Sequence, residues 1–324
     1  MRPLVEVRDL TLDFETEAGV AQVLDRVSFS IAEGEVFGLV GETGCGKTVT
    51  ALTILRLLPD NARIRGGSIT FLGEELLTKP EEEMNRIRGI RISMVFQDPG
   101  TSLNPVYPVG EQIAQVVRAH EGIEREPAKA RAIELFRRVG LADPESLVRR
   151  YPHELSGGMQ QRVMISMALA CRPKLLIADE PTTAVDVTIQ AQILELLREL
   201  RQEFRLSVLL ITHNLGIVAE MCDRIGVMYA GTVAEVAHTK DLFREPLHPY
   251  TQALLKALPR ADARGHPLAS IPGMVPSLLD PPSGCRFHPR CAFAFEACPK
   301  HRPELLEHRP AHRASCLLYE KVSG

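Results

Sequence analysis

The chain has 324 residues, of which 45% are hydrophobic, so it is long enough for one large domain and an appendage around a sizeable core. Its formal net charge of -3 and its lack of tryptophan give no sign of a basic nucleic-acid surface. No apolar run reaches the ~18 residues of a membrane-spanning helix, and Met1-Arg2-Pro3 does not resemble a signal peptide. We therefore expect a soluble, cytosolic protein whose role at a membrane would come through a partner.

Apolar segments between turn residues such as Gly19 and Gly34 predict short strands near the start of the chain. These strands are expected at residues 4–7, 12–14, 20–23, 27–31 and 36–40. The last of them is apolar throughout and leads directly into a glycine-rich segment. A helix is expected from about Lys47, and Pro59 stops it.

The glycine-rich segment matches the phosphate-loop pattern G-x-x-x-x-G-K-S/T. Its residues are Gly41, Glu42, Thr43, Gly44, Cys45, Gly46, Lys47 and Thr48. Because a strand precedes it and a helix follows it, we expect a site for ATP rather than a chance glycine turn. Lys47 should reach the β- and γ-phosphates, and Thr48 should ligate Mg2+. Cys45 lies beside Lys47 and a helix N-terminus, which predicts a lowered thiol pKa.

The middle of the chain has the spacing of helices, with apolar residues three and four positions apart over residues 98–170. Helices are expected at residues 110–119 and 127–139, and strands then alternate with helices over residues 175–229. This order predicts a parallel α/β core with a small β layer in front and a helical insert. After Phe243 prolines become frequent, so we expect a nucleotide-binding domain at residues 1–243 and a loop-rich extension at 244–324.

Polar side chains that follow the buried strands are candidates for chemistry, because ligands of open α/β sheets bind at this edge. Asp179 ends an apolar strand and would hold Mg2+, and Glu180 would act on the attacking water; capping of the next helix is the alternative. Gln97 could reach Mg2+ and the water. His213 could contact the γ-phosphate, although a core histidine is the alternative. Phe14 could stack on adenine or simply pack in the core.

Residues 155–161 read L-S-G-G-M-Q-Q and predict a helix that begins after Ser156 as its N-cap. A helix N-terminus preceded by glycines forms a second phosphate-binding surface, made here by Ser156, Gly157, Gly158 and Gln160. Because the phosphate loop already encloses the phosphates of its own nucleotide, this surface should serve a nucleotide held by another protomer. An ordinary capped core helix does not account for the Ser-Gly-Gly sequence. Asp186 would then lie at the dimer seam.

Four of the seven cysteines cluster near the end of the chain in the pattern C-x5-C-x6-C-x17-C: Cys285, Cys291, Cys298 and Cys316. The spacing is neither that of a zinc ribbon nor that of a bacterial ferredoxin. Four thiolates suit either Zn2+ or an iron–sulfur cluster, and four unligated thiols are the alternative. In a zinc site, His288, His301 or His312 could replace a cysteine.

The chain resembles an ATP-binding-cassette ATPase and, over nearly its full length, the ATPase subunit of oligopeptide, dipeptide and nickel importers. The segments that carry the resemblance are residues 96–99, 102–105, 220–224 and 247–251. It implies a P-loop NTPase core (RecA-like) with an N-terminal antiparallel β layer and a helical subdomain at about 98–170. It also implies that Gln97 couples the site to a membrane subunit, that Glu180 is the general base and that His213 orients the γ-phosphate. Met159 stands where the wider superfamily usually has Gln.

The resemblance further implies the partners: two membrane permease subunits, a second ATPase subunit and an extracytoplasmic solute-binding protein. The second ATPase would be a sister chain in a heterodimer, or another copy of this chain. The protein would lie at the cytoplasmic face of the membrane. Some members of the family hold a 4Fe-4S cluster in similar tails, which favours a cluster over zinc. Three alternatives remain: import of nickel or another small solute, a soluble ABC ATPase acting on DNA or ribosomes, and a redox-sensing tail.

Overall fold

The computed structural model describes residues 3–183, 186–258 and 271–320. The chain divides into two compact units: a first unit of Met1–Thr78 with Ile211–Gly324, and a second unit of Lys79–Leu210. Within the described ranges, no helix combines the length and the apolar character that crossing a bilayer requires.

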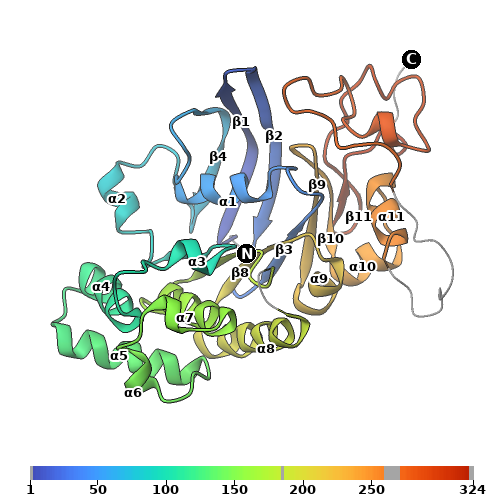
Figure 1. The fold of residues 1–324 in the computed structure, drawn as a ribbon. Helices are drawn as coiled ribbons and strands as arrows, with labels where there is room; N and C mark the ends of the chain where they lie inside the picture. The colour runs from blue at the N-terminus through green and yellow to red at the C-terminus, as the bar shows by residue number, and fades with distance from the viewer. Residues whose placement is uncertain (1–2, 184–185, 259–270, 321–324) are drawn as a thin grey trace. The chain divides into compact units, whose positions relative to one another are not determined.

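An antiparallel β layer forms the N-terminal part of the first unit (Figure 1, blue). Its strands follow the order β2-β1-β4-β5, and they comprise β1 (Val5–Thr16), β2 (Gly19–Ile31), β4 (Ala62–Phe71) and β5 (Glu74–Glu75). The sequence predicted four short strands where the structure has two long ones. The pairing of β1 with β2 continues through register shifts between Val7 and Asp13, so polar residues such as Asp9 interrupt the apolar pattern without ending the strand.

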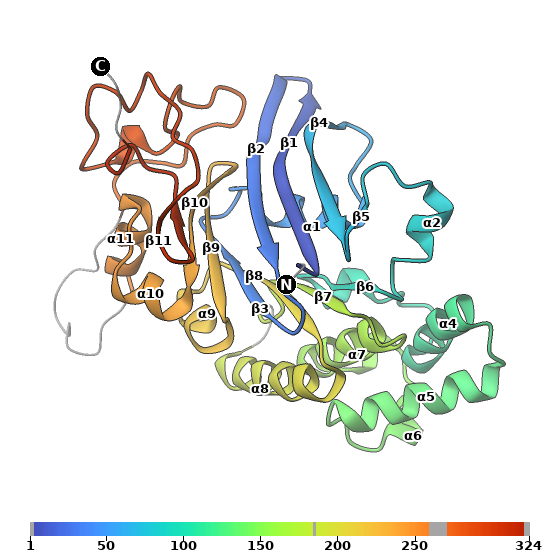
Figure 2. The same cartoon turned by 180° about the vertical axis from the view of Figure 1, so that it is seen from behind.

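A second sheet of the first unit includes β3, the strand that leads into the phosphate loop; Figure 2 labels its strands β3, β9, β10 and β11. In this unit its order is β11-β12-β10-β9-β3, made of β3 (Val36–Val40), β9 (Arg224–Tyr229), β10 (Thr232–His238), β11 (Leu306–Arg309) and β12 (His312–Ala314). Strands β3 and β9 are parallel, and all five side chains of β3 are buried. The expected loop-rich extension therefore also contributes a hairpin, because β12 pairs with β10.

Short helices accompany these strands in the first unit: α1 (Lys47–Leu55), α9 (Leu215–Met221), α10 (Thr239–Arg244), α11 (Pro249–Lys256) and the 3-10 turn η2 (His288–Arg290). Helix α1 ends earlier than Pro59, because Arg56 adopts a left-handed conformation with φ 52°.

The second unit combines a parallel strand pair with a group of helices. Strands β6 (Ile92–Val95) and β7 (Leu175–Asp179) pair in parallel, and the boundary between the two units along the chain falls within β8 (Ser207–Thr212). The helices are α2 (Glu81–Asn85), α3 (Pro99–Ser102), α4 (Val109–Glu121), α5 (Arg125–Arg138), α6 (Pro144–Leu147), η1 (Pro152–Glu154), α7 (Gly157–Leu169) and α8 (Val187–Phe204). Helices α4 and α5 contact each other and bury apolar faces that include Ile113 and Phe136.

Candidate functional site

The phosphate loop connects β3 to α1 in a conformation that requires glycine. A Cβ atom at Gly41 would lie 2.1 Å from the carbonyl oxygen of Met228, so no larger residue fits there. Gly46 is the N-cap of α1 in the left-handed region, with φ 101°. These two glycines let the chain turn tightly from a buried strand into a helix whose N-terminus favours anions.

Lys47 lies within the loop that precedes it. Its Nζ donates hydrogen bonds to the carbonyl oxygens of Gly41 (2.8 Å) and Glu42 (3.1 Å), and its side chain is buried. Thr43, Gly44 and Thr48 are exposed on the same loop. The loop therefore presents exposed backbone groups at a helix N-terminus together with a fixed positive charge, which is an arrangement suited to phosphate.

The structure corrects the prediction for Cys45. Its side chain is completely buried, and burial raises the pKa of the thiol more than the nearby charge of Lys47 lowers it. The sequence showed the cation and the helix N-terminus but not the loss of solvent around the sulfur atom. In this fold Cys45 is a small buried residue.

In the second unit, parallel pairing brings two predicted residues together. Asp179 ends β7 and is buried, whereas Gln97 follows β6 and is exposed. Glu180 has φ 46°, and its Oε2 accepts hydrogen bonds from Gln97 Nε2 (3.1 Å) and from Thr183 Oγ1 (2.9 Å). A polar amide and two carboxyl groups thus lie where β6 and β7 end.

The remaining predicted nucleotide contacts occupy separate elements. His213 follows β8 and is exposed. Phe14 is half-buried on β1, opposite Ala21 of β2 and Ala62 of β4. The phosphate loop, Phe14 and His213 belong to the first unit, while Gln97, Asp179 and Glu180 belong to the second.

Helix α7 begins as its sequence predicts. The Oγ atom of Ser156 accepts a hydrogen bond from the backbone N–H of Met159 (3.4 Å), and Ser156 and Gly157 are exposed. The Nε2 atom of Gln160 donates a hydrogen bond to the carbonyl oxygen of Pro152 (2.8 Å). Ser156 and Gly157 therefore remain accessible at a helix N-terminus, whereas the Gln160 amide already has a partner.

Gly158 has a packing role that the sequence analysis excluded. A Cβ atom at this position would lie 2.9 Å from Cγ2 of Ile189 on α8, so the two helices approach too closely for a side chain. The close approach of α7 and α8 therefore accounts for the glycine at position 158. Asp186, predicted at a dimer seam, caps α8 by accepting a hydrogen bond from the Ile189 N–H (2.9 Å).

The four clustered cysteines lie near one another but do not form a ligand group. Among the described residues, no set of three or more cysteine, histidine, aspartate or glutamate side chains is placed to hold a metal ion. Burial, together with the other three thiols, raises the pKa of Cys316 to about 12, and burial chiefly raises that of Cys285 to about 11. The structure therefore does not support the expected four-cysteine metal site.

The histidines considered as substitute ligands in that site have other surroundings. The Nε2 atom of His312 lies 2.6 Å from Oε1 of the buried Glu235, and the Nδ1 atom of His288 lies 2.9 Å from the carbonyl oxygen of Cys285. His301 is exposed.

Two residues to which the sequence analysis gave no role contact the phosphate loop. Arg290 forms an ion pair with Glu42 (2.8 Å), and the hydroxyl of Tyr250 accepts a hydrogen bond from the Glu42 N–H (3.1 Å). Both come from the C-terminal extension. The sequence signals are that Tyr250 lies in the segment 247–251, which carries part of the resemblance, and that Arg290 lies between Cys285 and Cys291.

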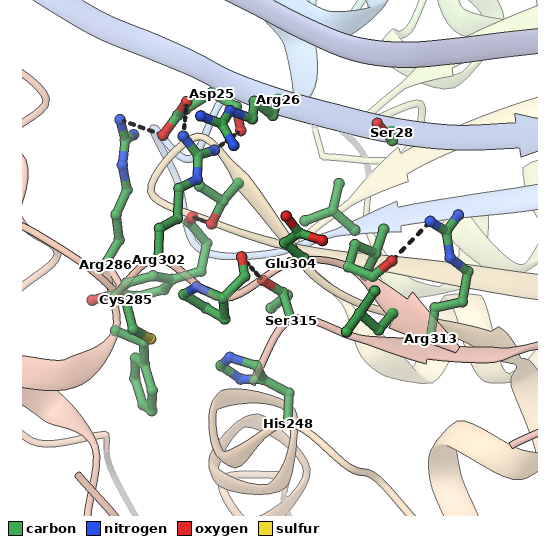
Figure 3. A pocket seen from close by; sticks show the side chains of 18 of the residues that line it. Asp25, Arg26, Ser28, His248, Cys285, Arg286, Arg302, Glu304, Arg313 and Ser315 are labelled. Atoms are coloured by element: carbon green, nitrogen blue, oxygen red, sulfur yellow. Dashed lines mark hydrogen bonds and ion pairs between the residues drawn. The ribbon is translucent and has the colours of Figure 1, made fainter. Parts of the chain in front are cut away.

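A cavity of about 660 Å³ is lined by residues of the β layer and of the extension, and its lining includes no residue of the phosphate loop (Figure 3). Asp25 of β2 pairs there with Arg286 (3.3 Å) and with Arg302 of the extension. These ion pairs hold the extension against the β layer.

Two family models match the chain. The ABC transporter model matches residues 24–183, and the model of the oligopeptide/dipeptide transporter C-terminal region matches residues 234–298. A protein of Sinorhizobium fredii, "Probable peptide ABC transporter ATP-binding protein y4tR", is 52% identical, with 97% of this chain and 94% of that protein covered. The oligopeptide transport ATP-binding protein OppD of Salmonella typhimurium is 48% identical, with 97% and 93% covered.

Solved structures share the fold. A dimeric post-hydrolysis structure of the ATP-binding cassette MJ0796 with ADP and Pi has a TM-score of 0.65 and 26% identity, and it covers 72% of this chain and 98% of that chain. The phosphate loop, the β layer and these matches define an ABC-type ATPase. Within that class, the chain belongs to the family of ATP-binding proteins of peptide transporters, because its relatives match it from the cassette through the extension.

Proposed function

We propose that this chain hydrolyses ATP to drive the import of dipeptides and oligopeptides through a membrane transporter. The phosphate loop, with Lys47 fixed inside it, is the observation that carries the ATPase part of the proposal. The peptide part is supported by the match of residues 234–298 to the C-terminal region of oligopeptide/dipeptide transporters.

The proposed chemistry assigns one task to each polar residue. Lys47 and the loop N–H groups bind the phosphates, and Glu180 takes a proton from the attacking water. The water oxygen bonds to the γ-phosphorus while the bond from that phosphorus to its bridging oxygen breaks, which releases ADP and phosphate. Thr48, Asp179 and Gln97 would supply oxygen ligands for Mg2+, which would neutralise phosphate charge when bound. His213 orients the γ-phosphate, and Phe14 packs against adenine.

The proposed site is completed by a second ATPase subunit. The exposed Ser156 and Gly157 at the start of α7 are suited to bind the γ-phosphate of a nucleotide held by that partner. A dimer in the MJ0796 structure supports this arrangement. Asp186 would lie beside the same seam. The partner is a sister chain or a second copy, and the complete transporter adds two permease subunits and an extracytoplasmic solute-binding protein at the cytoplasmic membrane.

Uptake by whole cells tests the cargo. A strain that lacks its own copy of this subunit should regain uptake of a labelled dipeptide when it carries the wild-type chain but not Lys47→Ala, because the variant cannot hold ATP. Labelled nickel should not follow the same pattern. Restored nickel uptake without peptide uptake would contradict the proposed peptide import and indicate nickel import instead.

The four clustered cysteines support a second, narrower proposal of a zinc ion or a 4Fe-4S cluster in the extension. Its support is their mutual proximity: the thiols of Cys285, Cys291 and Cys298 all raise the pKa of Cys316. Metal binding would require the thiolate form of the cysteine ligands. Anaerobic purification, a visible spectrum and metal analysis test it, and a colourless protein free of iron and zinc would reject both metals.

A further inference from the structure

Every polar group of Glu42 in the phosphate loop has a partner within the first unit. The backbone N–H donates to the hydroxyl of Tyr250 (3.1 Å), and the backbone carbonyl accepts from Lys47 Nζ (3.1 Å). The carboxylate accepts two hydrogen bonds from Arg290, with Nη1 at 2.8 Å from Oε2 and Nη2 at 3.1 Å from Oε1. Glu42 therefore links the C-terminal extension to the lysine of the loop.

The pair between Arg290 and Glu42 is shielded from water. Only 6% of the Arg290 side chain and 26% of the Glu42 side chain are exposed. Two parallel, charge-assisted bonds fix both the distance and the orientation of the partners, and shielding makes them stronger than a surface pair. The hydrogen bonds to Glu42 also raise the pKa of Arg290, so its guanidinium stays charged.

Arg290 is itself held in place. Its Nε atom donates to the carbonyl oxygen of Pro272 (2.9 Å), and its Nη1 atom lies 3.4 Å from the hydroxyl of Tyr229. Arg286, which lies four residues earlier, donates to the carbonyl oxygen of Gln22 (3.2 Å) and pairs with Asp25. The segment at residues 285–291 is thus attached at two points, to the β layer and to the phosphate loop.

The aromatic side chains under this contact make it rigid. Tyr250 and Tyr229 have ring centroids 4.6 Å apart, and Phe287 lies 5.0 Å from Tyr229 and 5.3 Å from Tyr250. All three are buried. Because Phe287 lies between the two arginines in the sequence, its packing also fixes the backbone that carries them.

We propose that Arg290 is a positioning residue for ATP binding. By holding the Glu42 carboxylate, it sets the place of the Glu42 carbonyl, which in turn holds the ammonium group of Lys47. The extension thereby keeps the loop in a shape that receives phosphates before nucleotide arrives. This inference rests on the proposed binding of ATP by the same loop.

Nucleotide affinity and steady-state kinetics of the full chain test the proposal. We expect Arg290→Ala to weaken binding of a fluorescent ATP analogue with Mg2+ by about tenfold. The KM for ATP should rise by a similar factor with kcat nearly unchanged, because Glu180 is not touched. Arg290→Lys keeps the charge but loses the paired bonds, so it should fall between Arg290→Ala and wild type. Glu42→Gln should resemble Arg290→Ala.

Arg309→Ala is the matched control. Arg309 lies in the same extension and pairs with Glu245, but it contacts no residue of the phosphate loop. Its substitution should leave affinity and KM as in wild type. If Arg290→Ala does not fold, Arg290→Lys and Glu42→Gln carry the test. Wild-type affinity and KM in the folded Arg290 and Glu42 variants would overturn the proposal.

The same experiment separates this inference from the function on which it rests. Lys47→Ala should lose nucleotide binding. If the wild-type chain binds ATP and Lys47→Ala does not, a normal Arg290→Ala variant refutes only the positioning role. If the wild-type chain does not bind ATP, both the proposed function and this inference fail.

Discussion

The hydrogen bonds around Glu180 suit its proposed role as the general base. Glu180 follows the buried Asp179, and it accepts hydrogen bonds from Gln97 and Thr183 (3.1 and 2.9 Å). These bonds hold the carboxylate in one orientation, which suits the proposed role of general base. Its positive φ of 46° is an uncommon conformation for a residue other than glycine, and such strain is frequent where a side chain must be aimed.

Glu180→Gln should lower kcat for ATP hydrolysis by about 10²- to 10⁴-fold, because the amide cannot take the proton of water. The shape of the side chain and its acceptor for Gln97 are kept, so binding of MgATP should stay close to that of wild type. Phosphate release and analogue fluorescence measure the two effects. Hydrolysis at the wild-type rate would assign the base to another residue.

Cys45 shows that the pKa of a thiol cannot be predicted from its neighbours in the sequence unless its burial is known. A neighbouring lysine predicts a lowered pKa, yet complete burial raises it. Desolvation of the thiolate by burial outweighs the attraction of one nearby cation here.

Among the elements, α11 depends on a buried histidine. The Nδ1 atom of His248 accepts a hydrogen bond from the Tyr250 N–H (3.0 Å) at the start of the helix. Burial lowers the pKa of His248 to about 4 from an ordinary value of 6.5. A protonated ring could not accept this bond, so the native helix start requires the neutral form.

Acidification should therefore destabilise the protein through His248. The unfolded chain takes up the proton near pH 6.5 and the folded chain only near pH 4, so stability is complete above pH 6.5 and falls toward pH 4. The loss amounts to roughly 3 kcal/mol of the free energy of unfolding. In His248→Asn, which keeps a capping acceptor, urea unfolding at pH 7 and pH 5 should differ less than in wild type. An equal difference would show that other groups cause the loss.

Elements with a strong local pattern were predicted closely. Strand β3 at residues 36–40 has the predicted bounds, because it is a short apolar run between clear breakers. The long strands β1 and β2 were divided into pieces. Their register shifts place polar residues at positions where a regular strand would be apolar, and only pairing with β4 and with each other shows the continuity.

For the molecule as a whole, the central expectation is that two ATPase subunits share each nucleotide. Ser156 and Gly157 are exposed at the N-terminus of α7, so they are accessible to a nucleotide held by a partner. Gly158 differs, since its contact with Ile189 explains it. The shared site thus rests on Ser156 and Gly157.

Ser156→Arg should reduce ATP hydrolysis by the assembled transporter by about 10²-fold, as expected when a donor to a transition-state phosphate is lost. MgATP binding by the separate chain should not change, because Ser156 would serve the nucleotide of the partner. Ser146→Arg, at an exposed serine of α6, is the control and should hydrolyse ATP normally. Weakened binding by separate Ser156→Arg would place the serine in the chain's own site instead.

The sequence by itself determined the phosphate loop, the strand before it, the N-cap at Ser156 and the family, because these depend on residues close together in the chain. Tertiary structure decided what no local pattern contains: the burial of Cys45, the contact at Gly158 and the absence of a ligand group among the clustered cysteines of the described ranges. It also joined Arg290 to Glu42 across 248 positions, and side chains so distant in sequence meet only when the whole chain packs.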